Sequence, residues 1–277
     1  MTSAAEHWAE QLAGWAIPED ILAQAPEPPW IFPTAIFARR VAANRSLETP
    51  DRVAARQALG EGGSVLDVGA GAGAASLALV PPATSIVAVD AEPTMLEELE
   101  RQARALPAPG GGSRPPLSVR TVLGRWPGVA DLVEPQDVAV CHHVVYNVAD
   151  IAPFVSALAA RARRRTVVVL PEDHPLSWMR PLWTRFWGID RPDGPTAEDL
   201  LEVLGEQGIS PQVRWFEDAA FAAADTAEER AAQLLATRRR LCLTADRDTE
   251  IAEALDELPR RARRVVAVWW DTSTALP

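Results

Sequence analysis

The sequence predicts an α/β protein in which parallel strands alternate with helices. Apolar segments that suit buried strands recur along the chain, and continuous runs such as Val167-Val168-Val169-Leu170 are typical of parallel strands covered on both faces. A glycine-rich turn follows the first of these segments, and helical patterns separate the others. At 277 residues, with 48% hydrophobic and 23% charged residues, the chain suits one enlarged domain with a sizeable core.

Five strands are expected in the first part of this sheet. Pro93 stands where the helix after the second strand would begin, because proline is favoured in the first helical turn. The segment 107–116 is rich in proline and glycine and is predicted to be a surface loop. The strands are expected at residues 64–68, 86–90, 118–123, 137–142 and 166–170, and the helices at about 73–80, 93–105 and 151–162.

Helices are also expected on both sides of this alternating region. Residues 1–60 are expected to form an N-terminal helical cap, with one helix from Thr34 towards Asn44 and another that begins at Pro50 and has Thr49 as its cap. Later segments continue the α/β pattern. They are an aromatic helix within 175–187, a helix from Thr196 to Gly208 with Asp199 completing a capping box, strands at 212–216 and 264–271, and two helices within 225–258.

The most informative segment is the glycine-rich turn. The first strand leads through Asp67 to Gly69, Gly71 and Gly73, and the second strand ends at Asp90, about 20 residues after the first glycine. Glycine has no Cβ and tolerates positive φ, so such a turn can bring its backbone against a ligand. A carboxylate at the end of the second strand can accept hydrogen bonds from two ribose hydroxyls. This arrangement predicts a site for a nucleoside-bearing cofactor.

Asp67 helps to separate two cofactor classes that share this geometry. In dinucleotide enzymes the turn binds a pyrophosphate, which a carboxylate just before the turn would repel, although Gly69, Gly71 and Ala74 also fit the dinucleotide spacing. Asp67 could instead attract an ammonium group, such as the one in S-adenosylmethionine. The pattern from Asp67 to Gly73 resembles the acid-x-Gly-x-Gly-x-Gly motif of the class I S-adenosylmethionine-dependent methyltransferases.

The resemblance implies a fold and a set of cofactor contacts. The fold would be a doubly wound, mostly parallel seven-stranded sheet, closed by two strands of which one is reversed. Residues 61–277 would form the cofactor-binding domain with a helical insertion at about 218–260, and the N-terminal helices would cover the cofactor and shape the acceptor pocket. The residues expected to bind S-adenosylmethionine are Asp67, Gly69, Ala70, Gly71, Gly73, Asp90, Ala91, Gly124, Arg125, Trp126 and His142.

The adenine contact departs from the family pattern. Relatives commonly place an acid after the third strand to accept from the adenine amino group, and this chain has Gly124, Arg125 and Trp126 there. We therefore expect the backbone of Gly124 and Arg125 to make that contact. Trp126 would either flank the adenine ring or pack in the core.

The end of the fourth strand supplies candidates for catalysis. In the resembled family this segment lies beside the reactive methyl group, and here it contains His142 and His143. Histidine is the usual general base because its unperturbed pKa lies near neutral pH. We expect His143 first, and then His142, to serve this role. Tyr146 or Glu172 would orient the acceptor, although Glu172 could equally cap the helix that follows it. The tryptophans at 178–187 would form either a hydrophobic acceptor wall or a buried helix.

Composition narrows the substrate class. The formal net charge of -11 repels phosphate backbones, and the arginine clusters at 161–165, 238–240 and 260–264 suit helix ends and solvated faces. Cys141 and Cys242 offer at most one disulfide and no metal-ligand spacing, so no metal site is expected. This cysteine usage, with no signal pattern or membrane-spanning run, predicts a cytoplasmic protein.

The sequence therefore predicts a methyltransferase that transfers a methyl group from S-adenosylmethionine to a small-molecule acceptor by in-line displacement. Three alternatives stay open. They are an RNA or protein methyltransferase that docks through the arginine clusters, a nicotinamide-dependent oxidoreductase, and a cofactor-binding protein without catalysis. The acceptor is not evident from the residues, and a homodimer is as open as a monomer.

Overall fold

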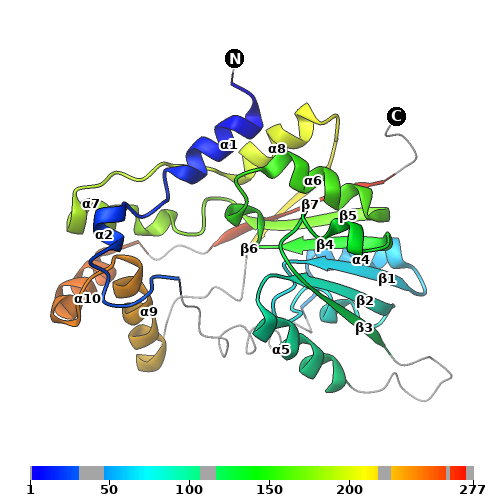
Figure 1. Ribbon diagram of the computed structural model, residues 1–277, viewed down its shortest axis with the longest axis horizontal. Helices are drawn as coiled ribbons and strands as arrows, with labels where there is room; N and C mark the ends of the chain where they lie inside the picture. The colour runs from blue at the N-terminus through cyan, green and yellow to red at the C-terminus, as the bar shows by residue number, and fades with distance from the viewer. Residues whose placement is uncertain (1, 31–46, 107–116, 218–225, 260–262, 273–277) are drawn as a thin grey trace.

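A seven-stranded sheet forms the centre of the computed structural model, which describes residues 2–30, 47–106, 117–217, 226–259 and 263–272 (Figure 1). The strands are β1 (Gly63–Val68), β2 (Ala83–Asp90), β3 (Ser118–Leu123), β4 (Gln136–His142), β5 (Ala162–Pro171), β6 (Gln212–Glu217) and β7 (Arg264–Asp271). Their order is β3-β2-β1-β4-β5-β7-β6, and all neighbours are parallel except that β7 runs antiparallel to both β5 and β6. This confirms the predicted mostly parallel sheet with one reversed strand.

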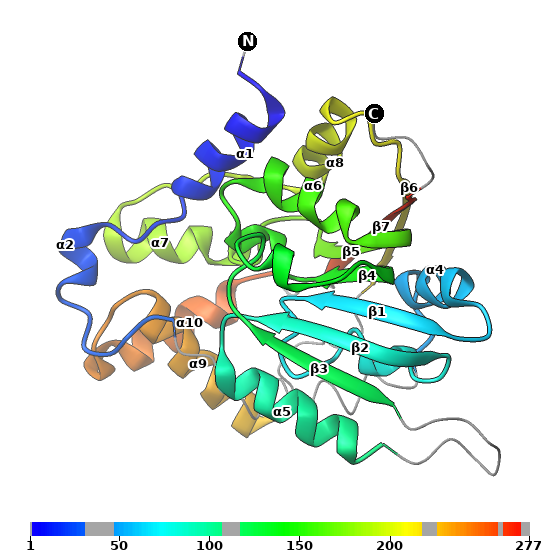
Figure 2. The same cartoon turned by 45° about the vertical axis from the view of Figure 1, so that its right-hand side comes forward.

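Helices cover both faces of the sheet (Figures 1 and 2). One face carries α1 (Ala4–Ala13), α6 (Ile151–Ala160) and α8 (Ala197–Glu206), and the other carries α4 (Pro50–Leu59) and α5 (Pro93–Arg104). Successive residues of β4 point to opposite faces, as the pleat requires. Ala139 and Cys141 pack with the α1, α6 and α8 residues, whereas Val138 and Val140 pack with those of α4 and α5. Each face therefore has its own apolar core.

A further group of helices lies beyond the carboxyl ends of the parallel strands (Figures 1 and 2). It contains α2 (Glu19–Leu22), α7 (Arg180–Trp187), α9 (Ala227–Arg240) and α10 (Asp248–Glu257), and the last two stand between β6 and β7 along the chain. A third apolar cluster holds these helices together, with Ile17, Met179, Leu241 and Ile251 among its buried members. We call these four helices the helical layer. None of the described helices is long and apolar enough to cross a membrane.

The predicted helix at 73–80 is wrong, because the structure has turns there and a 3-10 helix at Leu77–Leu79. Ser76 donates its N–H and its hydroxyl to the Asp67 carboxylate, at 3.3 and 2.5 Å, so this N–H does not join a helical ladder. Pro81 and Pro82 follow, and a proline disfavours the helical conformation of the residue before it. The helix expected from Thr34 and the loop at 107–116 lie outside the described residues.

Of the two predicted helix caps, one has the expected side-chain hydrogen bond and the other does not. At the start of α8, the Thr196 hydroxyl accepts from the Asp199 N–H and the Asp199 carboxylate accepts from the Thr196 N–H, which confirms the capping box. At the start of α4, Thr49 has the extended backbone of a cap residue, but its side chain makes no cap hydrogen bond. Its buried hydroxyl oxygen has no hydrogen-bond partner.

These two threonines form a matched pair for a stability measurement. We expect Thr196→Ala to lower the free energy of unfolding by about 1 kcal/mol, because the cap hydrogen bonds of α8 are lost. Thr49→Ala should change it by only a few tenths, since no such bond exists there. Urea denaturation followed by circular dichroism measures both values, and equal losses would contradict the assignment of the caps.

Candidate functional site

Main-chain hydrogen bonds attach the glycine-rich turn to the end of β2. The N–H groups of Gly69 and Ala70 both donate to the Val89 carbonyl, at 2.8 and 3.1 Å. Gly69 and Gly71 have φ values of 69° and 51°, a region that favours glycine. A Cβ added to Gly69 would lie 2.3 Å from Val144, whereas one added to Gly71 would meet no atom of the described residues within 4 Å. The turn thus packs against the chain after β4 at Gly69 and leaves an open approach to its backbone at Gly71.

Asp90 fixes the open part of this turn. Its carboxylate accepts from the Gly71 N–H at 2.7 Å and from the Glu92 N–H at 2.9 Å. A carboxylate offers about four lone-pair positions, so two hydrogen bonds leave acceptor capacity on a partly exposed group. Ala91, which was predicted to bind the cofactor, follows directly and is also partly exposed. Asp90, the residue predicted to bind the ribose, therefore lies at the open side of the turn.

Asp67 is a buried acid with an unused oxygen. Its side chain is 1% exposed, and both hydrogen bonds from Ser76 go to Oδ2. Oδ1 is buried, and no described residue donates a hydrogen bond to it. Burial raises the pKa of Asp67 to about 6, against the opposing effect of the Ser76 hydrogen bonds. A buried carboxylate oxygen without a donor is costly, so this position favours a cationic or hydrogen-bond-donating ligand.

The end of β3 carries the residues predicted to contact adenine. The Gly124 N–H donates to the Asp90 carbonyl at 2.9 Å, and the Arg125 side chain is exposed. Trp126 is 9% exposed and packs in the core of the α1, α6 and α8 face, where its indole N–H donates to the Phe154 carbonyl. Of the two roles left open for Trp126, the structure thus favours packing.

Leu123 is a candidate site residue that was not predicted from the sequence. It pairs with Asp90 in the register of β2 and β3, at the carboxyl end of both strands. It is nevertheless 57% exposed, which is unusual for a leucine at the end of a parallel strand. The signal in the sequence was its place as the last apolar residue before Gly124. An apolar surface beside Asp90, the residue predicted to bind the ribose, suits the face of a purine ring.

The two histidines after β4 have different surroundings. His143 is exposed, with a left-handed φ of 61°, and its N–H donates to the Val169 carbonyl at 2.7 Å. His142 Nε2 lies 3.7 Å from the carboxylate of Asp51, which is 4% exposed. Burial lowers the pKa of His142, and the charge of Asp51 opposes that shift. Asp51 was not among the residues predicted from the sequence, because its place at the start of α4 is an ordinary one for an acid.

Tyr146 and Glu172 are engaged with the protein itself. The Tyr146 hydroxyl is buried and donates to the Pro171 carbonyl at 2.8 Å, and its ring stacks on Trp8. Burial raises the pKa of this phenol. Glu172 forms an ion pair with Arg264 at 2.6 Å. The expectation that Tyr146 orients an acceptor therefore does not fit its position, since the hydroxyl holds the ends of β4 and β5 together. Glu172 could orient an acceptor, as predicted, only if its ion pair with Arg264 were broken.

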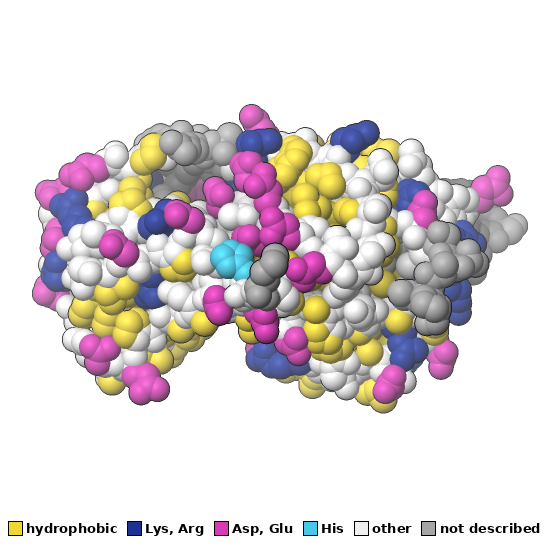
Figure 3. Space-filling model, turned by 90° about the horizontal axis from the view of Figure 1, so that it is seen from above, with side chains coloured by type: hydrophobic (Ala, Val, Ile, Leu, Met, Phe, Trp, Pro, Cys, Tyr) yellow, Lys and Arg dark blue, Asp and Glu magenta, His cyan; other side chains and the backbone are white. Residues whose placement is uncertain are grey.

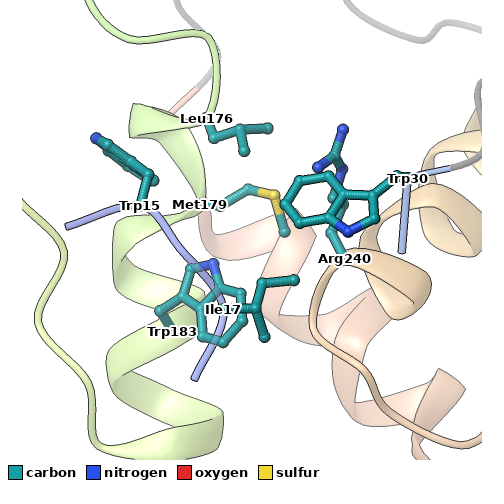
Figure 4. Close-up of a pocket in the computed structure, with 7 residues that line it drawn as sticks. All are labelled: Trp15, Ile17, Trp30, Leu176, Met179, Trp183 and Arg240. Atoms are coloured by element: carbon teal, nitrogen blue, oxygen red, sulfur yellow. The ribbon is translucent and has the colours of Figure 1, made fainter. Parts of the chain in front are cut away.

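A narrow aromatic cavity of about 10 Å³, room for about one water molecule, lies beside the helical layer (Figure 4). Trp15 and Trp183 stand on one side, and on the other the Arg240 guanidinium lies 4.5 Å from the ring centroid of Trp30. His174, three residues after β5, stacks on Trp15 at 4.2 Å. Burial lowers the pKa of His174 to about 3. The lining residues are Trp15, Ile17, Trp30, Leu176, Met179, Trp183 and Arg240.

Most of the described arginines in the predicted clusters form ion pairs within the chain. Acidic side chains are prominent on the surface, and seen from above they gather around a histidine (Figure 3). Six of the nine described arginines of the predicted clusters form ion pairs with acids of the chain, in the pairs Arg161–Asp131, Arg164–Asp137, Arg165–Asp271, Arg238–Asp248, Arg239–Glu27 and Arg264–Glu172. Such arginines offer less charge to a polyanion. Within the described ranges no group of three or more potential metal ligands is present.

Solved structures share this fold. The YcgJ protein from Bacillus subtilis is similar with a TM-score of 0.53 and 16% identity, over 81% of this chain and 98% of that chain. The plantazolicin methyltransferase BamL is similar with a TM-score of 0.51 and 11% identity, over 96% of this chain and 98% of its own. No family model and no curated protein matches the chain. The fold is that of the class I S-adenosylmethionine-dependent methyltransferases, as the glycine motif indicated.

The two glycines of the turn should respond differently to substitution. Gly71→Ala should lower the free energy of unfolding by about 1 kcal/mol, because alanine is strained at positive φ. Gly69→Ala should lower it by about 2–4 kcal/mol, since its Cβ also collides with Val144. Chemical denaturation of both variants gives the comparison. Equal losses would show that the contact with Val144 is not a constraint on the turn.

Proposed function

We propose that this protein is a methyltransferase that uses S-adenosylmethionine to methylate a small molecule. The observation that carries the proposal is the glycine-rich turn, which has an open backbone at Gly71 between the carboxylates of Asp67 and Asp90. The turn stands at the carboxyl ends of β1 and β2, where parallel α/β sheets bind their ligands. Crystals of BamL contained S-adenosylhomocysteine, the product that this cofactor leaves behind.

The residues of the turn fit the parts of S-adenosylmethionine. Asp90 would accept from the ribose hydroxyls, and the unused oxygen of Asp67 would face the ammonium group, directly or through a water. Leu123 and the backbone of Gly124 would border the adenine. The cofactor supplies a methyl group on a positively charged sulfur, which is already electrophilic. The protein's main task is then to align the acceptor with that methyl group.

The acceptor is proposed to be a small molecule with an apolar part. The aromatic side chains that line the narrow cavity of the helical layer, at the carboxyl side of the sheet, support this choice, and the cavity must widen to admit such a molecule. The pairing of the described arginines and the net charge of -11 weigh against RNA docking. We propose that residues 1–60 and the segment 218–260 flank the methyl-transfer site. BamL, which shares this fold, was crystallised with a triazolic desmethyl plantazolicin analogue as well as S-adenosylhomocysteine.

Calorimetry with S-adenosylmethionine, S-adenosylhomocysteine and NAD tests the cofactor assignment. We expect the first two to bind and NAD not to bind. In the Asp90→Ala variant the affinity for both should fall by about 1–3 kcal/mol, or roughly 5- to 150-fold, because ribose hydroxyls and the Gly71 N–H lose their acceptor. Binding of NAD alone would overturn the proposal, and unchanged affinity in a folded variant would remove Asp90 from the site.

The raised pKa of Asp67 makes a further prediction for the same measurement. In the free protein this carboxyl is protonated below about pH 6, and an ammonium partner favours its charged form. Binding therefore releases a proton, so the affinity for S-adenosylmethionine should rise as the pH increases from 5 to 7 and then level off. Asp67→Asn should bind more weakly and lose that rise. A pH-independent affinity in the native protein would contradict the contact.

A further inference from the structure

We infer that Asp51 and His142 form a carboxylate–imidazole pair that removes a proton from the acceptor during methyl transfer. His142 is the general base and Asp51 is a positioning residue that acts through it. The acceptor group is then one that carries a proton to be lost, such as a hydroxyl or an N–H. This inference rests on the proposed function and specifies the chemistry at the same site.

The place of His142 in the sheet brings it to the glycine-rich turn. It is the last residue of β4, and β4 lies next to β1 with Val140 opposite Asp67. Continuing that register by two residues sets His142 beside Gly69. The contact between Gly69 and Val144 confirms that the chain after β4 lies against the turn. His142 therefore stands next to the glycine-rich turn, against which the cofactor is proposed to bind.

Asp51 approaches His142 from α4. Its carboxylate is 6% exposed and lies 3.7 Å from Nε2 of His142, whose side chain is 19% exposed. This separation is longer than a hydrogen bond and within the range of charge pairing, and such contacts often tighten when a substrate binds. Arg52 of the same helix also faces the pair, and one of its N–H groups donates to the Leu47 carbonyl.

Burying a carboxylate costs free energy, so the placement of Asp51 calls for a partner. The N-terminal turn of α4, where Asp51 lies, supplies part of the compensation through the helix dipole. His142 supplies the titratable part. In this geometry the acid is paired with a group that gains charge only when it takes a proton, which is the arrangement that stabilises an imidazolium as it forms.

The other histidines of the chain are less suited to the role. His174 is 5% exposed and stacked on Trp15, and its pKa of about 3 keeps it neutral at physiological pH. His143 and His7 are largely exposed to solvent. His142 combines a partly exposed edge with a buried carboxylate.

In the proposed step, methyl transfer is accompanied by loss of the acceptor proton. The lone pair of the acceptor oxygen or nitrogen forms a bond to the methyl carbon, and the carbon–sulfur bond breaks with its electron pair remaining on sulfur. The acceptor proton passes to Nδ1 of His142, while Nε2–H faces Asp51 and holds the ring in the required tautomer. The products are the methylated acceptor, S-adenosylhomocysteine and a protonated His142, which returns its proton to solvent through its exposed edge.

Nuclear magnetic resonance titration of the histidines tests the pair without knowledge of the acceptor. The chain has four histidines, so His142→Gln identifies the His142 signals. Asp51→Asn should lower the pKa of His142 by about one unit or more, because an opposite charge within about 4–6 Å is lost. Asp51→Glu keeps the charge and should restore most of the native value. An unchanged pKa in a folded Asp51→Asn variant would overturn the pairing.

Asp137→Asn is the matched control. It removes the same charge from the strand that carries His142, but Asp137 lies at the amino end of β4, where it binds Ser64 and Arg164. Five residue steps along the strand, or about 16 Å, separate it from His142. The pKa of His142 should therefore stay at its native value in this variant. An equal shift in both variants would indicate a general charge effect and overturn the specific pairing.

A second titration, on the native protein, tests whether His142 faces the methyl group. S-adenosylmethionine carries a positive sulfur that S-adenosylhomocysteine lacks, while their other charged groups are the same. The pKa of His142 should be lower in the first complex by about 0.5 or more, since like charges repel. Coincident titrations with both ligands bound would overturn this inference alone. Failure of both ligands to bind would overturn the proposed function and the base role together.

Discussion

The bonds between the glycine-rich turn and the end of β2 are the constraint on which the site depends. The Val89 carbonyl accepts hydrogen bonds from two N–H groups of the turn, and the Asp90 carboxylate accepts one from the N–H of Gly71. These bonds oblige the backbone to adopt positive φ values at the glycines and turn it sharply over the sheet edge. Because the turn is held on one side and packed against Val144 on the other, its open side has a defined position.

Two carboxylates are buried near this turn, where apolar side chains would pack at a lower cost in free energy. Asp67 and Asp51 are both less than 5% exposed, and each meets its polar partner at the carboxyl edge of the sheet, in Ser76 and in His142. Buried charges weaken a fold unless they are compensated. Their concentration at the edge where parallel sheets bind ligands is a physical reason to regard that edge as the functional one.

The sequence predicted the strands well because their signals are local. Apolar runs such as 166–170 and the capping box of Thr196 with Asp199 depend on neighbours along the chain. The helix at 73–80 could not be rejected in this way, since its N–H at Ser76 is diverted by a carboxylate nine residues earlier. Likewise the pairing of Asp51 with His142 joins residues 91 positions apart, and no spacing rule predicts it.

The helical layer has an apolar core separate from the two cores of the sheet, built from segments that precede β1, follow β5 and precede β7. Mutations inside it can reshape the aromatic cavity without disturbing the glycine-rich turn. Under the proposed function, a lineage or a directed-evolution library can thus change which acceptors are admitted while the residues of the cofactor turn stay the same. Diversification confined to α7, α9 and the residues around Trp15 is the natural route to new selectivity on this scaffold.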